Sequence, residues 1–277
     1  MVVEGERMLG GGTSAVLVTL AGVEVEELVS ATDDKLELVA AVHPSAFNGD
    51  VTIVSDTGSV VTNQGAWTYL SPGQISSVAP NYGQLNTKVE ISGTDLLGDG
   101  SGLTSVTLAG VEAEIVDATA DSVKLVVRDS ADTGPGDIVM TAGTGGRVTS
   151  TDGWTYKQKG VVLTVSPSSG REGTEVSIYG LSLFGHGSTI ETVTLAGISA
   201  TIVDQTDLYV IVTTPAADAA DGAIEITSDT GATITSADAW SFIGAAEITS
   251  VTPAVGQVGT VIEIEGINML GGAESLK

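Results

Sequence analysis

The sequence predicts an all-β protein built from tandem β-sandwich modules. The chain has 277 residues and repeats with a period of about 87. The string Val-Thr-Leu-Ala-Gly recurs at residues 18–22, 106–110 and 193–197, and each copy is followed at a fixed distance by Trp67, Trp154 or Trp240. A fixed long period is the signature of an array of similar modules, so a feature found in one copy is weak evidence for a function of the whole array.

Within each repeat, apolar and polar residues alternate in short segments rich in Val, Ile and Thr, as in half-buried strands. Such segments lie at residues 89–92, 122–127, 137–141, 176–179, 207–212, 223–227 and 261–265. Turn signals such as Asn48-Gly49-Asp50 and Asp99-Gly100 separate them. No segment has a convincing helical period, so we expect two antiparallel sheets packed face to face in each module.

Each module opens with the pattern Pro-x-x-Gly-x-x-Gly/Asn-Thr, which begins at Pro80, Pro167 and Pro253. Proline interrupts the first strand, where a ladder hydrogen bond is dispensable. The variable position holds Asn86 in one module and glycine in the others, and these two residue types adopt positive φ most readily. We therefore expect a turn here that leads into the next strand.

The repeat divides the chain into a module lacking its first strand at 1–73, whole modules at 74–160 and 161–245, and the opening strands of a fourth at 246–277. Two explanations of the incomplete ends stay open. The chain is a window on a longer array, which we favour because Met1 and Lys277 fall at no natural boundary, or the ends complete each other between copies. Linkers of only four or five residues predict a semi-rigid rod spanning on the order of 100 Å.

Acidic residues outnumber basic ones 35 to 10, which gives a formal net charge of −25. No cluster of Lys and Arg is present to bind a phosphate backbone, so we exclude nucleic acid as a partner. The charge also disfavours anionic membranes, and no stretch approaches the ~20 apolar residues of a membrane span. The chain has no cysteine, and residues 1–30 carry no signal-peptide pattern.

The segments Ile75-Ser-Ser-Val-Ala-Pro80 and Val89-Glu-Ile-Ser-Gly93 resemble the opening of an IPT/TIG domain, which has an immunoglobulin-like fold. Residues 106–110, 121–126, 136–139 and 154–156 continue the match, and the next module matches equally well from Leu163 to Phe242. The aromatic residue that the family usually has after its second strand is replaced by Leu97 and Leu270 and kept as Phe184.

This resemblance implies tandem immunoglobulin-like sandwiches that act as spacers or binding modules in surface receptors and secreted proteins. Another branch of the family occurs in transcription factors, and the negative charge disfavours it here. Because a fold does not fix a function, the residues must be weighed separately.

The two histidines, His43 and His186, each occur in one module only, and we expect both to be lone surface residues. No constellation of nucleophile, base and acid is recognisable, and cysteine is absent. We therefore predict no enzyme, no catalytic residue and no cofactor-binding residue.

Oxygen ligands of the kind that Ca²⁺ prefers cluster at Asp95, Asp99 and Ser101 and again at Asp129 and Asp132. The first cluster is not kept in the other modules and lacks the spacing of an EF-hand loop. We interpret both as solvated turn residues and predict no defined metal site. Weak Ca²⁺ binding and diffuse cation binding by the acidic surface stay open.

Trp67, Trp154 and Trp240 lie on the closing strand of each module, where we expect core or inter-module packing; a sugar-stacking platform is the alternative. As a whole, the sequence predicts a structural subunit of an extracellular or cell-surface rod or filament, self-associating head to tail. One alternative is the stalk of an adhesin or receptor whose ligand-binding module lies elsewhere. Another is a carbohydrate-binding accessory region of a secreted enzyme, and glycans and cations stay candidate ligands.

Overall fold

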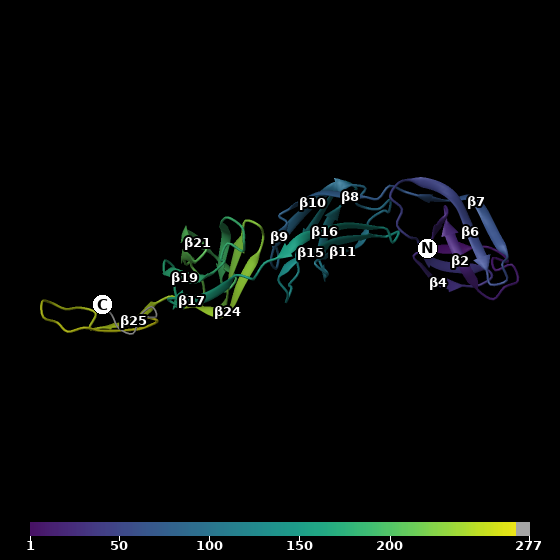
Figure 1. Ribbon diagram of the computed structural model, residues 1–277. Coiled ribbons are helices and arrows are strands. Elements are labelled where there is room, and N and C mark those ends of the chain that lie inside the picture. The colour runs from purple at the N-terminus through teal and green to yellow at the C-terminus, as the bar shows by residue number, and fades with distance from the viewer. Residues whose placement is uncertain (270–277) are drawn as a thin grey trace.

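The computed structural model describes residues 1–269, which form three β-sandwiches and a terminal hairpin strung out in chain order (Figure 1). Every regular element in this part of the chain is a strand. Residues 1–269 contain no helix long and apolar enough to cross a membrane. The prediction of an all-β chain of tandem sandwiches is confirmed.

The first module packs a three-stranded sheet against a four-stranded one. Its strands are β1 Val2–Glu4, β2 Ala15–Leu20, β3 Val23–Glu24, β4 Glu27–Ala31, β5 Lys35–Val39, β6 Phe47–Ser55 and β7 Val60–Tyr69. The sheet orders are β1-β5-β4 and β3-β2-β6-β7. Alternate residues of β5 are buried, as the period-two pattern predicts.

The second module has four strands in one sheet and five in the other. Its strands are β8 Gln74–Ala79, β9 Tyr82–Gly83, β10 Lys88–Thr94, β11 Leu103–Leu108, β12 Val111–Glu112, β13 Glu114–Ala118, β14 Ser122–Val126, β15 Gly134–Ala142 and β16 Arg147–Tyr156. The sheet orders are β13-β14-β10-β8 and β12-β11-β15-β16-β9.

The third module repeats this arrangement, followed by a hairpin of β25 and β26. Its strands are β17 Val161–Ser166, β18 Ser169–Gly170, β19 Glu175–Leu181, β20 Ile190–Leu195, β21 Ile198–Gln205, β22 Tyr209–Thr213, β23 Ala220–Ser228 and β24 Thr233–Phe242, and the hairpin has β25 Glu247–Thr252 and β26 Glu263–Ile267. Here β21 is continuous and pairs with both β20 and β22, so it joins the two sheets along one edge.

The first strand of each whole module is divided between the two sheets. In the second module, β8 pairs antiparallel with β10, whereas β9 pairs in parallel with β16 of the opposite sheet. Pro80 lies between the two pieces, where a missing N–H costs the ladder nothing. The turn that follows has Asn86 at φ +65°, Gly173 at +78° and Gly259 at +91° in the three copies, which confirms the predicted positive φ.

Each sandwich has its own apolar core, closed by an aromatic pair on the last strand. Trp154 is 0% and Trp240 is 1% exposed, and both pack edge-on against the next aromatic residue of the strand, Tyr156 and Phe242. The expectation of core packing is confirmed for these two residues. Trp67 makes the same edge-on pair but is only half-buried.

Among the described residues, two strands of the first module, β1 and β7, lack a neighbour that their counterparts in the whole modules have: β7 pairs with β6 alone, whereas β16 and β24 also pair with β9 and β18. Strand β1 pairs with β5 alone, whereas its counterparts β10 and β19 each lie between two strands. That the first module lacks its first strand stays a prediction. The proposed module boundaries stay predictions, and residues 270–277 of the fourth module, Leu270 included, lie outside the described residues.

Replacing Trp154 with Ala should lower the free energy of unfolding of the second module by about 3–5 kcal/mol, because a fully buried indole leaves a cavity. Trp67→Ala should cost less, since Trp67 is only half-buried. Urea titrations followed by circular dichroism measure both, with Val116→Ala, a residue that is 61% exposed, as a control near zero. Equal losses at the two tryptophans would contradict the difference in burial.

Candidate functional site at the joint between the second and third modules

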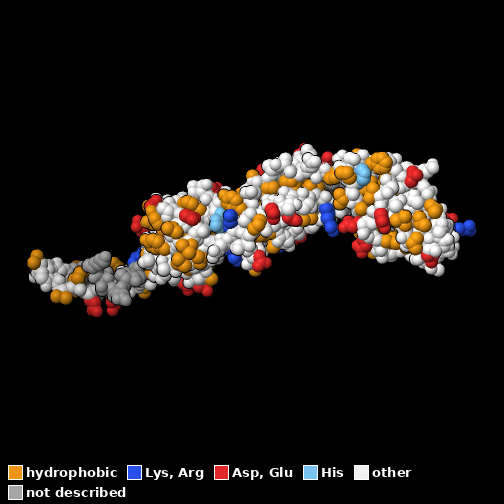
Figure 2. All heavy atoms as spheres, in the orientation of Figure 1, with side chains coloured by type: hydrophobic (Ala, Val, Ile, Leu, Met, Phe, Trp, Pro, Cys, Tyr) orange, Lys and Arg blue, Asp and Glu red, His pale blue; other side chains and the backbone are white. Residues whose placement is uncertain are grey.

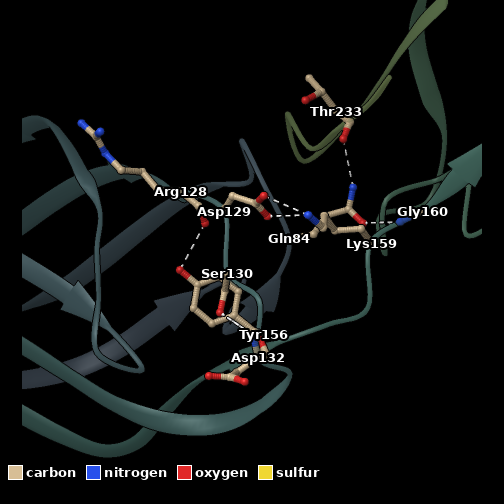
Figure 3. Close-up of polar contacts among 9 residues, drawn as sticks. All are labelled: Gln84, Arg128, Asp129, Ser130, Asp132, Tyr156, Lys159, Gly160 and Thr233. Atoms are coloured by element: carbon tan, nitrogen blue, oxygen red, sulfur yellow. Dashed lines mark hydrogen bonds and ion pairs between the residues drawn. The ribbon is translucent and has the colours of Figure 1, made fainter. Parts of the chain in front are cut away.

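The turn that follows β9 carries Gln84 to the end of the second module that faces the third (Figure 3). Gln84 is only 1% exposed, although glutamine is usually a surface residue. The turn is held locally by Thr87, whose hydroxyl oxygen accepts the Gln84 backbone N–H at 3.1 Å. A buried side-chain amide needs a partner for its donor and another for its acceptor. The linker and the third module supply them.

The Gln84 side chain bridges the linker and the third module. Its Nε2 donates to the Thr233 carbonyl oxygen at 3.1 Å, and its Oε1 accepts the Gly160 backbone N–H at 2.7 Å. Because one partner is an acceptor and the other a donor, a single orientation of the amide satisfies both. We call this arrangement of Gln84, Gly160 and Thr233 the Gln84 clamp.

Three further hydrogen bonds connect the same turn with the β23–β24 hairpin. Asn86 Nδ2 donates to Thr233 Oγ1 at 2.8 Å. The Lys88 N–H donates to the Thr230 carbonyl oxygen at 2.8 Å, and the Thr233 N–H donates to the Leu85 carbonyl oxygen at 3.3 Å. The two modules are therefore joined by backbone as well as side-chain hydrogen bonds, and their relative orientation is fixed at several points.

The linker between the modules is held from both sides. Lys159 forms an ion pair with Asp129 of the second module at 2.8 Å, and His186 Nε2 of the third module lies 2.7 Å from the Gln158 carbonyl oxygen. The ion pair is about half exposed, so it adds little stability in solution.

Tyr156, the last residue of β16, lies beside this linker and is buried. Its hydroxyl donates to the Arg128 carbonyl oxygen at 3.3 Å. Burial, with a smaller effect from the Asp129 carboxylate, raises the pKa of Tyr156 to about 12. The folded module therefore disfavours the phenolate and keeps Tyr156 as a neutral donor.

The joint between the first and second modules has no buried clamp among the described residues. Within residues 1–269, no hydrogen bond or ion pair connects the stretch 1–70 with the stretch 74–156. In the third module Arg171 takes the place of Gln84, and its Nη2 reaches the Asn268 carbonyl oxygen at 3.5 Å on an exposed surface. Gln257 takes that place in the hairpin, where it is exposed. Among the described residues, the joint between the second and third modules is therefore held by more hydrogen bonds than the joint between the first and second.

The two histidines contact backbone groups and no acidic side chain. His43 is half-buried and stacks on Tyr69, with ring centroids 5.1 Å apart. His186 is also half-buried and belongs to the joint, where its backbone takes φ +69° and its ring meets the linker. Both histidines are thus partly exposed, and His186 also contacts the linker through the Gln158 carbonyl oxygen, which the sequence did not predict.

The acidic clusters lie where the sequence places them, in turns. Asp95 and Asp99 adopt φ +51° and +60°, Asp129 pairs with Lys159, and the Asp132 backbone bonds to the Ser130 hydroxyl. In the part of the chain that the structure describes, no three His, Cys, Asp or Glu side chains come together as metal ligands. Weak cation binding stays a prediction.

Sequence reasoning did not select Gln84. The available signal was that a long polar side chain follows the turn glycine in every copy, as Gln84, Arg171 and Gln257. That pattern alone is typical of an exposed turn, because nothing within the module buries the residue. The aromatic pattern was more informative, since Trp154 and Trp240 lie in the cores and offer no flat face to a sugar.

Comparison with known proteins gives one family match. The model of the IPT/TIG domain matches residues 74–156 and 161–242, which together make up more than half of the chain. No curated protein matches the chain.

Several solved structures are similar in fold at low sequence identity. The extracellular region of plexin A4 is 13% identical with a TM-score of 0.42, covering 91% of this chain and 28% of that one. A Bacteroides ovatus SGBP-B in complex with a mixed-linkage heptasaccharide is 14% identical with a TM-score of 0.27, covering 86% and 62%. The I9–I11 tandem of titin is 11% identical with a TM-score of 0.27, covering 88% and 100%. The chain thus spans under a third of that plexin region.

Replacing Gln84 with Ala should destabilise the joint by about 1–3 kcal/mol, because the Gly160 N–H and the Thr233 carbonyl oxygen lose their partners. Differential scanning calorimetry should show the second and third modules melting less cooperatively. The matched control is Gln257→Ala, at the equivalent but exposed position, which should leave the melting curve unchanged. Similar effects of both changes would contradict the clamp.

The raised pKa of Tyr156 predicts a loss of stability at high pH. Since the folded-state pKa is about 12 and the usual value is 10.0, the contribution is fully present below about pH 10 and disappears as the pH rises to about 12. Urea midpoints measured across this range should fall less steeply in Tyr156→Phe, which cannot ionise, than in the wild type. Identical pH profiles would show that the hydroxyl is not shielded.

Proposed function

The chain belongs to the IPT/TIG domain family, and on that premise we propose that it is a stiff spacer within an extracellular or cell-surface protein. The observation that carries this proposal is the Gln84 clamp. In it, a buried polar side chain holds the orientation of two modules by hydrogen bonds. A catalytic site would need reactive groups held together in a pocket. Among the five buried polar residues, Gln84 is the one whose side chain bonds across a joint.

The length of the linkers supports the same role. Four residues separate β16 from β17, and Lys159 and Gln158 of this segment are held by side chains on either side. A short tethered linker leaves few relative orientations of its modules. The net charge of −25 favours solubility of an extended molecule with a large surface.

A second candidate is head-to-tail assembly of this polypeptide into a filament. The outer edge of β1 has no partner among the described residues, and an open edge is a template for strand addition. Strand β25 carries the pattern Ile248-Thr-Ser-Val251 that β8 carries as Ile75-Ser-Ser-Val78. In the second module that strand pairs with β10, the counterpart of β1. Strand β25 of another copy would occupy this edge by exchanging its partner β26 for β1, because its matching edge pairs with β26 within the chain.

Two further roles agree with an extracellular array and have less support. As the stalk of an adhesin or receptor, the chain would present a binding module that lies elsewhere. As a carbohydrate-binding region, it would need exposed aromatic faces, and the burial of Trp154 and Trp240 removes the two strongest candidates.

Electron microscopy and small-angle X-ray scattering of the 277-residue chain test the spacer and the filament together. For a spacer we expect rods in which the second and third modules keep one orientation, with a wider range of angles in Gln84→Ala than in the control Gln257→Ala. Free bending at this joint in the wild type would contradict the spacer. Regular filaments that grow with concentration would support assembly, and monodisperse rods of fixed length would exclude it.

A further inference from the structure

The third module exposes an apolar patch on the outer face of its sheet. Leu163 is 60%, Tyr179 is 49% and Leu181 is 51% exposed, and the half-buried Tyr209 and Ile211 lie beside them. We call these five residues the tyrosine patch. Tyr179 and Tyr209 are direct partners across β19 and β22, with ring centroids 6.1 Å apart. Figure 2 shows hydrophobic side chains gathered over β19 and β21 of this module.

The repeat supplies an internal control for this surface. The second module has the same strand register, in which Ser92 pairs with Ser122 as Tyr179 pairs with Tyr209. All five equivalent positions of the second module are polar: Ser76, Ser92, Thr94, Ser122 and Lys124. The sandwich therefore folds without apolar side chains at these sites. Their presence in the third module must have another reason, because exposed apolar patches cost solubility and mark interaction surfaces.

The chemistry of the tyrosine patch favours a protein over a sugar. Three of its five residues are aliphatic, and the Tyr209 hydroxyl already donates to Asp204 at 2.7 Å. A sugar brings many hydroxyl groups that need hydrogen-bond partners, and this surface offers few. Tyrosine among aliphatic residues is instead the composition of protein–protein interface cores, and tyrosine is frequent among the residues that dominate binding energy.

The charge around the tyrosine patch indicates which kind of protein can bind there. Residues 161–242 contain ten acidic residues and one basic residue, Arg171. Glu175 lies on β19 with Tyr179, and Asp204 contacts Tyr209 directly. A second copy of the chain would bring the same acidic rim and be repelled, whereas basic residues around an apolar centre would complement it.

We propose that the tyrosine patch is a docking site for another protein, one that presents apolar side chains ringed by Lys and Arg. This proposal does not depend on the spacer role. It makes the third module a specific attachment point within the array.

The experiment uses a displayed library of random peptides, selected on the full chain. Selected peptides should be rich in aromatic, aliphatic and basic residues and should bind more weakly as salt rises. In fluorescence anisotropy, affinity should fall about tenfold or more for Y179S/Y209S, which installs the residues of the second module and keeps the charge. The control is Val116→Ser, which changes an exposed apolar residue on the edge strand β13 and should bind like the wild type. Ile211→Lys serves as a second test if the double variant does not fold.

Other outcomes overturn the proposal. Peptides that bind the wild type and Y179S/Y209S equally, or a selection that yields none, would show that the patch is not a docking site. A dimer in sedimentation velocity that Y179S/Y209S abolishes would assign the patch to a second copy. Binding on a glycan array that the same variant abolishes would assign it to a sugar.

Discussion

The division of the first strand between two sheets is the constraint on which each whole module depends. Buried backbone groups must be hydrogen-bonded, so the strand cannot simply end inside the sandwich. By crossing at Pro80, one segment completes the edge of both sheets, as β8 beside β10 and as β9 beside β16. The crossing also carries the following turn to the end of the sandwich. Gln84 can meet the third module only because the strand arrives there.

The hydrogen bonds at the joint fix the relative orientation of the two modules more than they raise the stability of the fold. Each hydrogen bond of the Gln84 amide is worth only about 0.5–1.5 kcal/mol net, because water would satisfy the same groups in the open state. Breaking one while the residue stays buried costs more, since the group then has no partner. The clamp therefore raises the free energy of other angles between the modules by more than it lowers the free energy of the observed angle. That asymmetry suits a spacer, whose task is to hold a direction.

The pattern in the sequence predicted those features that repeat within every module. The strands, the positive φ of Asn86 and the burial of Trp154 and Trp240 all follow from local alternation, turn chemistry and spacing. Gln84 was missed because the sequence pattern describes each module by itself, whereas the burial of Gln84 comes from contacts with Gly160 in the linker and Thr233 in the third module.

The repeat, the acidity and the sandwich fold are encoded locally, because a strand needs only its own alternation and an adjacent turn. The surfaces that join modules or bind partners are not encoded locally in this way. The Gln84 clamp and the tyrosine patch each involve residues from separate strands or modules, and each looks ordinary when read along the chain. They become recognisable when the folded modules can be superimposed position by position, because the fold brings Tyr179 to Tyr209 and Gln84 to Thr233.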